Sequence, residues 1–143
     1  MKIRPSPCLL ILVGLISASV FSQTTTDSPQ PPAHEHTVVI EGLVRDVACP
    51  IQNLEATATR LSMKCLRACA KAGSPIVILT NEGDIFTPIS DKMPDTGQRQ
   101  MLMPWLGKYV RASGMVYERK GTHAIAISKI EEMKDVRLTV EDQ

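Results

Sequence analysis

Five short β-patterned segments, glycines in the first and fourth of them, and one alanine-rich helical segment predict a mixed α+β domain that is mainly β. Five short strands with glycine-bearing bends are typical of a small, partly open, OB-like barrel. The one main helix would follow strand 1, whereas the common OB arrangement has its helix between strands three and four. An α+β sheet with the helix across one face is therefore an alternative.

Residues 1–22 have the pattern of a secretory signal peptide. Lys2 and Arg4 precede the apolar run CLLILVGLI, which gives way to the small residues of SASVFS. The run is too short to span a bilayer, so we expect no stable membrane insertion after signal cleavage at Ser22 or Ser19. Cys8 would leave with the signal, and the mature protein would be periplasmic or secreted.

Residues 23–36 are predicted to form a flexible linker. The sequence QTTTDSPQPPAHEH has three prolines and no large apolar side chain, so it cannot bury enough surface to offset the entropy lost on ordering. His34 and His36 lie on this linker, and we expect them to be solvated rather than to bind a metal.

The OB-like domain is predicted over residues 37–135 and begins with a strand. The sequence TVVIEGLVRDV alternates apolar and polar side chains, and Gly42 marks a bend or bulge within it. Pro50 ends this strand, because proline cannot donate a hydrogen bond to a neighbouring strand.

A helix is predicted over residues 54–72. Asn53 is a suitable N-terminal cap, the segment LEATATRLSMKCLRACAKA is rich in helix-forming residues, and Gly73 and Pro75 end it.

Two hairpins are predicted in the second half of the domain. The segments PIVILT and DIFTPI flank the turn sequence NEG, and KYVRASGMVYE and HAIAISKIEEM flank RKGT. A polar loop and a short helical turn around RQMLMPWL separate the two hairpins. The C-terminal tail, residues 136–143, would add a short strand or stay loose.

Charge and composition exclude several classes of function. Without Lys2 and Arg4, the 16 basic side chains of the chain fall to 14, against 15 acidic ones, and the whole chain has five aromatic residues. Nucleic-acid binding requires a clustered basic surface or aromatic stacking, so no nucleic acid is expected as a partner. The sequence has no phosphate-binding glycine loop, haem-attachment motif or Ser-His-Asp set, and we expect a non-catalytic protein.

Three cysteines remain after signal cleavage, and they are the candidate site. At about 100° per residue, Cys65 lies within an apolar stripe of the predicted helix and Cys69 at the edge of this stripe. Both thiols are therefore expected to face the core, with Met63 on the opposite face. The stripe consists of Leu54, Ala58, Leu61, Cys65, Ala68 and Ala72. Cys49 follows the first strand, so the returning helix can bring all three sulfurs together.

Three interpretations of these cysteines stay open. A disulfide from Cys49 to Cys65 or Cys69 would stabilise the domain by about 3 kcal/mol. Alternatively, Cys49, Cys65 and Cys69 would bind a soft metal ion, Cu(I) or Zn(II). A thiol-disulfide redox role is the third. A direct bond between Cys65 and Cys69 is disfavoured, because residues four apart on a helix are about 5–6 Å apart at Cβ.

The order G…C…CxxxCxxxGxP, together with VILTNEGDIF and GKYVRASGMV, resembles a group of small exported bacterial proteins of unassigned function. The resemblance covers nearly the whole folded region. In that group a histidine often stands three residues before the first helical cysteine, and this chain has Ser62 there. The CxxxC pair is also similar to the copper-binding motif of cytochrome-oxidase-assembly copper chaperones, which have a thioredoxin fold.

Together these observations predict an exported binding or accessory protein that handles Cu(I) or Zn(II) through Cys49, Cys65 and Cys69, its partner being the metal ion or another protein. The alternatives are a disulfide-stapled structural or protein-interaction domain and a thiol-disulfide redox protein.

Overall fold

A computed structural model describes residues 36–141 of the protein. The predicted signal peptide, Cys8 and His34 lie outside the described residues, as does the side chain of His36. No helix within residues 36–141 is long and apolar enough to cross a membrane.

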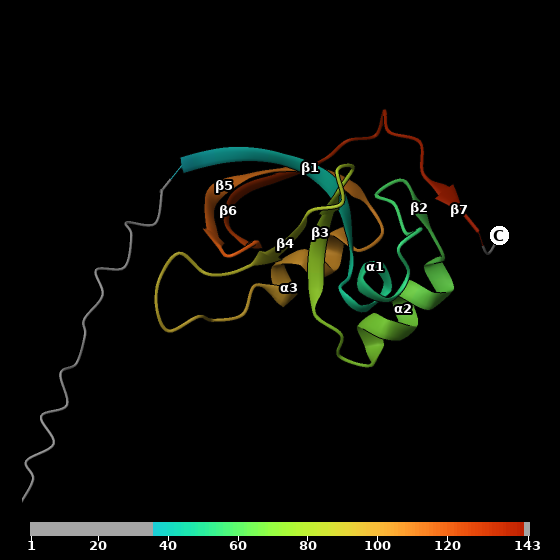
Figure 1. Ribbon diagram of the computed structural model, residues 1–143, viewed down its shortest axis with the longest axis horizontal. Coiled ribbons are helices and arrows are strands. Elements are labelled where there is room, and N and C mark those ends of the chain that lie inside the picture. The colour runs from blue at the N-terminus through green and yellow to red at the C-terminus, as the bar shows by residue number, and fades with distance from the viewer. Residues whose placement is uncertain (1–35, 142–143) are drawn as a thin grey trace, which may run out of the picture. The chain divides into compact units, whose positions relative to one another are not determined.

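Five strands form a ring (Figure 1). Their order around the ring is β1-β3-β4-β6-β5, with β5 pairing back onto β1. Every pairing is antiparallel except that between β4 and β6. Only two residue pairs join β3 to β4 in register, which makes this the shortest pairing in the ring. The fold is therefore the predicted small OB-like barrel. Its strands are β1 (His36–Asp46), β3 (Ile76–Thr80), β4 (Ile85–Pro88), β5 (Tyr109–Arg119) and β6 (Thr122–Glu132).

Both predicted hairpins are confirmed. The turn between β3 and β4 contains Gly83, whose φ is +93°. The turn between β5 and β6 has Lys120 and Gly121 at φ values of +49° and +79°, the backbone that a tight two-residue hairpin requires.

Glycines allow the long strands to curve around the ring. Gly42 pairs with Thr80 of β3 and with Val110 of β5, so β1 has a neighbour on both sides there. A Cβ atom on Gly42 would lie 2.3 Å from the carbonyl oxygen of Leu79. Gly114 in β5 lies at a register shift against β6, as expected for a bulge.

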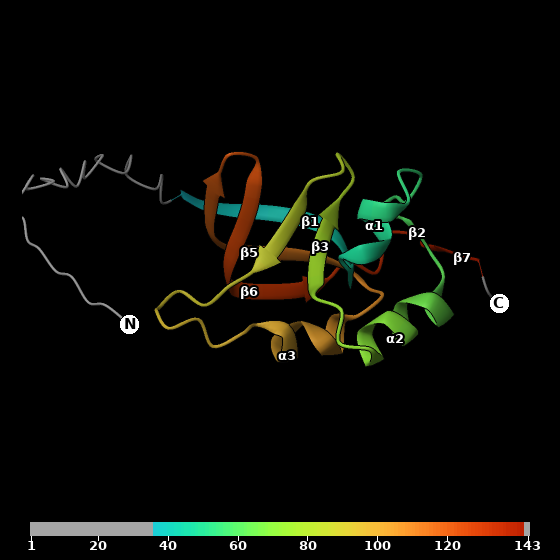
Figure 2. The same cartoon turned by 60° about the horizontal axis from the view of Figure 1, so that its bottom comes forward.

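Two helical regions close one end of the barrel (Figure 2). The helical turns α3 (Arg99–Leu102) and η1 (Met103–Trp105) connect β4 to β5, which is the usual position of the OB helix. The helix α2 (Met63–Lys71) is an addition between β1 and β3. Ala70 of α2 and Leu102 of α3 are both buried in the barrel interior, and Arg99 donates a hydrogen bond to the carbonyl oxygen of Ala70.

The predicted single helix over residues 54–72 is wrong in its first half. The chain instead forms a short helix α1 (Ala48–Gln52), a loop, and a strand β2 (Arg60–Leu61) before α2 begins. The strand β2 pairs in parallel with β7 (Thr139–Val140) in the C-terminal tail. This long-range pairing holds residues 60–61 extended against their local helix propensity.

A second apolar cluster lies outside the barrel. Leu43, Leu79 and Tyr109 point outward from their strands and pack against Leu61 of β2 and Leu66 of α2. This cluster attaches β2 and α2 to the barrel and fixes the position of the cysteine-bearing helix relative to the end of β1.

Candidate functional site

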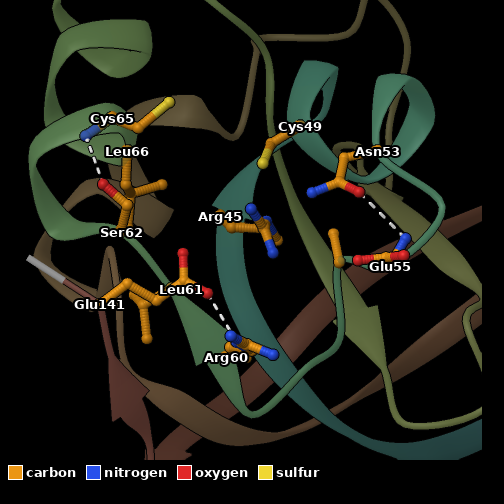
Figure 3. Close-up of a pocket in the computed structure, with 11 residues that line it drawn as sticks. Arg45, Cys49, Asn53, Glu55, Arg60, Leu61, Ser62, Cys65, Leu66 and Glu141 are labelled. Atoms are coloured by element: carbon orange, nitrogen blue, oxygen red, sulfur yellow. Dashed lines mark hydrogen bonds and ion pairs between the residues drawn. The ribbon is translucent and has the colours of Figure 1, made fainter.

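A pocket of about 280 Å³ lies between α1, β2 and α2 (Figure 3). We call it the thiol pocket, because Cys49 lies on its α1 wall and Cys65 on its α2 wall. Arg45 lies between these walls at the end of β1. The lining residues are Arg45, Cys49, Asn53, Glu55, Ala56, Arg60, Leu61, Ser62, Cys65, Leu66 and Glu141.

Cys49 is positioned by the carboxylate of Asp46. The backbone N–H of Cys49 donates to Asp46 Oδ2 at 3.0 Å, which holds the start of α1 against the end of β1. The Cys49 thiol is half-buried. Burial raises the pKa of this thiol most strongly and the charge of Asp46 adds to the rise, while the positive charge of Arg45 opposes it.

Cys65 and Cys69 lie one turn apart on α2. Ser62 caps this helix by accepting a hydrogen bond from the backbone N–H of Cys65 at 3.1 Å. Burial, then the negative charge of Asp46 and a hydrogen-bonding interaction with the Cys65 side chain, raise the pKa of the Cys69 thiol. The two thiols of α2 are therefore neighbours. The thiol of Cys69 also interacts electrostatically with Asp46 at the buried end of β1.

The prediction that both helical cysteines face the core needs correction. Cys65 is exposed and Cys69 is half-buried, while the buried residues of α2 are Leu66 and Ala70. The predicted stripe requires one continuous helix that extends back to Leu54. Because α2 begins at Met63 and packs through Leu66 and Ala70, Cys65 lies on the side that lines the pocket, and Cys69 lies one turn further along the helix.

Two buried charged residues were missed by the sequence analysis. Arg45 is 3% exposed and Asp46 is fully buried. Among the described residues, Arg45 Nε and Asp46 Oδ1 have no hydrogen-bond partner. The only signal in the sequence is a charged pair that ends three residues before Cys49, and strand alternation alone does not predict that both side chains are buried.

The structure brings Cys49 and Cys65 to one pocket, with Cys69 beside Cys65. All three are free thiols. Within residues 36–141, no three His, Cys, Asp or Glu side chains are close enough together to hold a metal ion as they stand. His123 lies elsewhere, with its ring 5.2 Å from that of Phe86.

No protein-family model, curated protein or solved structure matches this chain. The function is therefore argued from the residues of the thiol pocket.

Proposed function

We propose that this protein is an exported, non-catalytic accessory protein that holds one soft metal ion through Cys49, Cys65 and Cys69. One observation carries the proposal. Thiols on two separate helices face one pocket, and the third thiol lies one helical turn from Cys65. Binding would require α1 and α2 to move so that the three sulfurs meet around a common centre.

Thiolate chemistry favours Cu(I) over Zn(II) as the bound ion. Thiolates are soft ligands that select Cu(I), whereas protein zinc sites almost always have four ligands in a tetrahedron. The pocket offers two cysteines with a third beside them, and no histidine lines it. The described part of the site therefore lacks the fourth nitrogen or sulfur ligand that zinc prefers.

The raised pKa values of Cys49 and Cys69 argue against either thiol as the nucleophile of a thiol-disulfide enzyme. Such enzymes depend on an exposed thiolate of low pKa, whereas burial and Asp46 raise the pKa of Cys49 and of Cys69. A metal ion displaces these protons when it binds, so affinity rises with pH. Arg45 favours this step at Cys49, because its positive charge stabilises the thiolate.

A disulfide-stapled structural domain is the competing class. The placement of Cys49 and Cys65 on facing walls of one pocket favours it, because closure of the pocket would also bring these two sulfurs together. A bond between them would remove two of the three proposed metal ligands.

Anaerobic titration of the reduced protein with Cu(I), in the presence of a competing chelator, tests the proposal. We expect one Cu(I) per chain, and we expect Cys65→Ser and Cys49→Ser each to weaken binding by at least tenfold. Ala68→Ser is the matched control, because it adds the same hydroxyl group to an exposed position on the same helix.

Two outcomes would contradict the proposal. Wild-type protein that fails to compete for Cu(I) has no soft-metal site. Equal losses of affinity in Cys65→Ser and in the Ala68→Ser control would show that the thiol itself is not a ligand.

A further inference from the structure

Arg45 is a buried cation that forms no ion pair with the described carboxylates around it. Its side chain is 3% exposed, and it forms no ion pair with any residue of the described segment 36–141. Its one hydrogen bond, from Nη1 to the carbonyl oxygen of Thr57, is long at 3.4 Å, and Nε has no partner. Burying an unpaired charge is strongly unfavourable, so a partner for Arg45 is expected from outside the described residues.

The guanidinium group of Arg45 faces the thiol pocket. Figure 3 shows it at the centre of the pocket, between Cys49 on one side and Ser62 on the other. The neighbouring Asp46 alternates to the opposite face of β1, where Oδ2 accepts from the backbone of Cys49. Glu141 also lines the pocket, but its carboxylate is paired with Arg60. Asp46 Oδ2 and the carboxylate of Glu141 are thus already engaged. Glu55 also lines the pocket, but its carboxylate forms no ion pair with Arg45.

A second donor faces the same space. Asn53 Oδ1 accepts a hydrogen bond from the backbone N–H of Glu55 at 3.0 Å, which fixes the orientation of the amide. Figure 3 shows the amide nitrogen of Asn53 turned away from Glu55, toward the side of the pocket that holds Arg45. A neutral donor and a charged donor therefore flank one part of the pocket.

We propose that the thiol pocket binds a small monocarboxylate, whose carboxylate group pairs with Arg45 and accepts a hydrogen bond from Asn53. The guanidinium fork matches the two oxygens of a carboxylate. Leu61 and Leu66 supply an apolar wall for a short substituent. A volume of about 280 Å³ lies just below the usual range for sites that bind drug-sized ligands, so the ligand is small.

Charge balance favours a carboxylate over a phosphate. Arg45 and Arg60 are balanced in the pocket wall by Glu55 and Glu141. A monocarboxylate adds one negative charge to this neutral set, whereas a phosphate dianion adds two next to the existing carboxylates. This site requires no metal ion and does not depend on the proposed function.

Nitrogen-15 NMR of the arginine side chains tests this proposal on the full protein, reduced and freed of metal by a chelator. Sodium acetate is the probe, with sodium chloride at equal ionic strength as the salt control. We expect the Nε–Hε resonance of Arg45 to shift in a saturable manner with acetate and not with chloride. The resonances of Arg67 and Arg119, which are exposed and do not line the pocket, serve as internal controls.

Variants separate binding from folding. Asn53→Ala leaves Arg45 in place and is expected to weaken acetate binding by roughly tenfold, the effect of losing one hydrogen bond to a charged group. Arg45→Met removes the reporting resonance, so acetate binding by this variant is followed through the side-chain amide of Asn53, whose saturable shift should be abolished. The wild-type Arg45 resonance decides between the outcomes if that variant does not fold. Two results would overturn the proposal. In the first, the chemical shift of the Arg45 resonance does not change with acetate. In the second, it changes saturably with phosphate and not with acetate. Neither result would bear on Cu(I) binding, because no metal is present.

Discussion

At the scale of single residues, burial and Asp46 make Cys49 and Cys69 less acidic than ordinary thiols. Alkylating reagents attack the thiolate, so a raised pKa lowers the reactive fraction at a given pH. In the reduced, metal-free protein at pH 8, we expect iodoacetamide to modify the exposed Cys65 first and the other two cysteines several times more slowly. The pKa of Cys49 and the pKa of Cys69 are both raised above the ordinary thiol pKa of 9.0. Their alkylation rates should therefore continue to rise with pH above 9.0.

Peptide mapping of time points measures the three alkylation rates. The urea-unfolded chain is the control, in which the rates should converge because burial is lost. Faster modification of Cys49 than of Cys65 in the folded protein at pH 8 would contradict the structural account of this site.

Spacing predicted part of the site. Cys65 and Cys69 share one turn of a helix, as four-residue spacing requires. Their exposure was not predictable, because it depends on which face of α2 packs against the barrel. The buried positions of Arg45 and Asp46 depend on α1, β2 and the tail folding over the end of β1, and no local pattern encodes this.

At the scale of elements, the start of α2 positions Cys65, and Ser62 determines that start. Ser62→Ala removes the side-chain acceptor for the backbone N–H of Cys65, so we expect a loss of about 1 kcal/mol in the free energy of unfolding. Urea denaturation followed by circular dichroism measures it. Ser62→Asp keeps a capping oxygen and should restore most of this stability. An alanine variant as stable as wild type would show that the cap does not fix the helix.

Local sequence signals predicted the hairpins and the existence of α2 but not its first residue. The glycine turns at residues 83 and 121 specify their own backbone, so both hairpins follow from nearby residues. Residues 54–62 also carry helix-forming side chains, yet residues 60–61 pair with Thr139 and Val140. A partner so distant in the sequence cannot be identified from local periodicity.

At the scale of the whole molecule, closure of the barrel depends on Gly42. A Cβ atom there would lie 2.3 Å from a backbone oxygen of β3, which cannot move without shifting the strand. We expect Gly42→Ala to cost about 3 kcal/mol, from backbone displacement in a packed sheet. Gly121→Ala is the comparison, because that position is open and only its backbone angle is strained, at a cost of about 1 kcal/mol.

Thermal unfolding of the two glycine variants ranks these costs. A Gly42→Ala variant no less stable than Gly121→Ala would show that β1 and β3 do not approach as closely as the closed ring requires.

Strand number and glycine positions predicted the barrel, but the position of its helices was only partly predictable. The sequence suggested a departure from the OB arrangement, because the clearest helical pattern follows the first strand. The structure has a short helical connection at the usual OB position, α3 and η1, and carries α2 as an addition. Because α3 is only four residues long, its hydrophobic periodicity is too weak to identify it as the helix at the usual OB position.

Native mass spectrometry of the protein exported from copper-supplemented cells, purified without reductant, tests the central claim most directly. The thiol-pocket account predicts one copper ion per chain, which is lost in the Cys65→Ser variant and kept in the Ala68→Ser control. A metal-free chain lighter by two hydrogen masses, with a peptide map that joins Cys49 to Cys65 or Cys69, would contradict it and assign the cysteines to a structural disulfide.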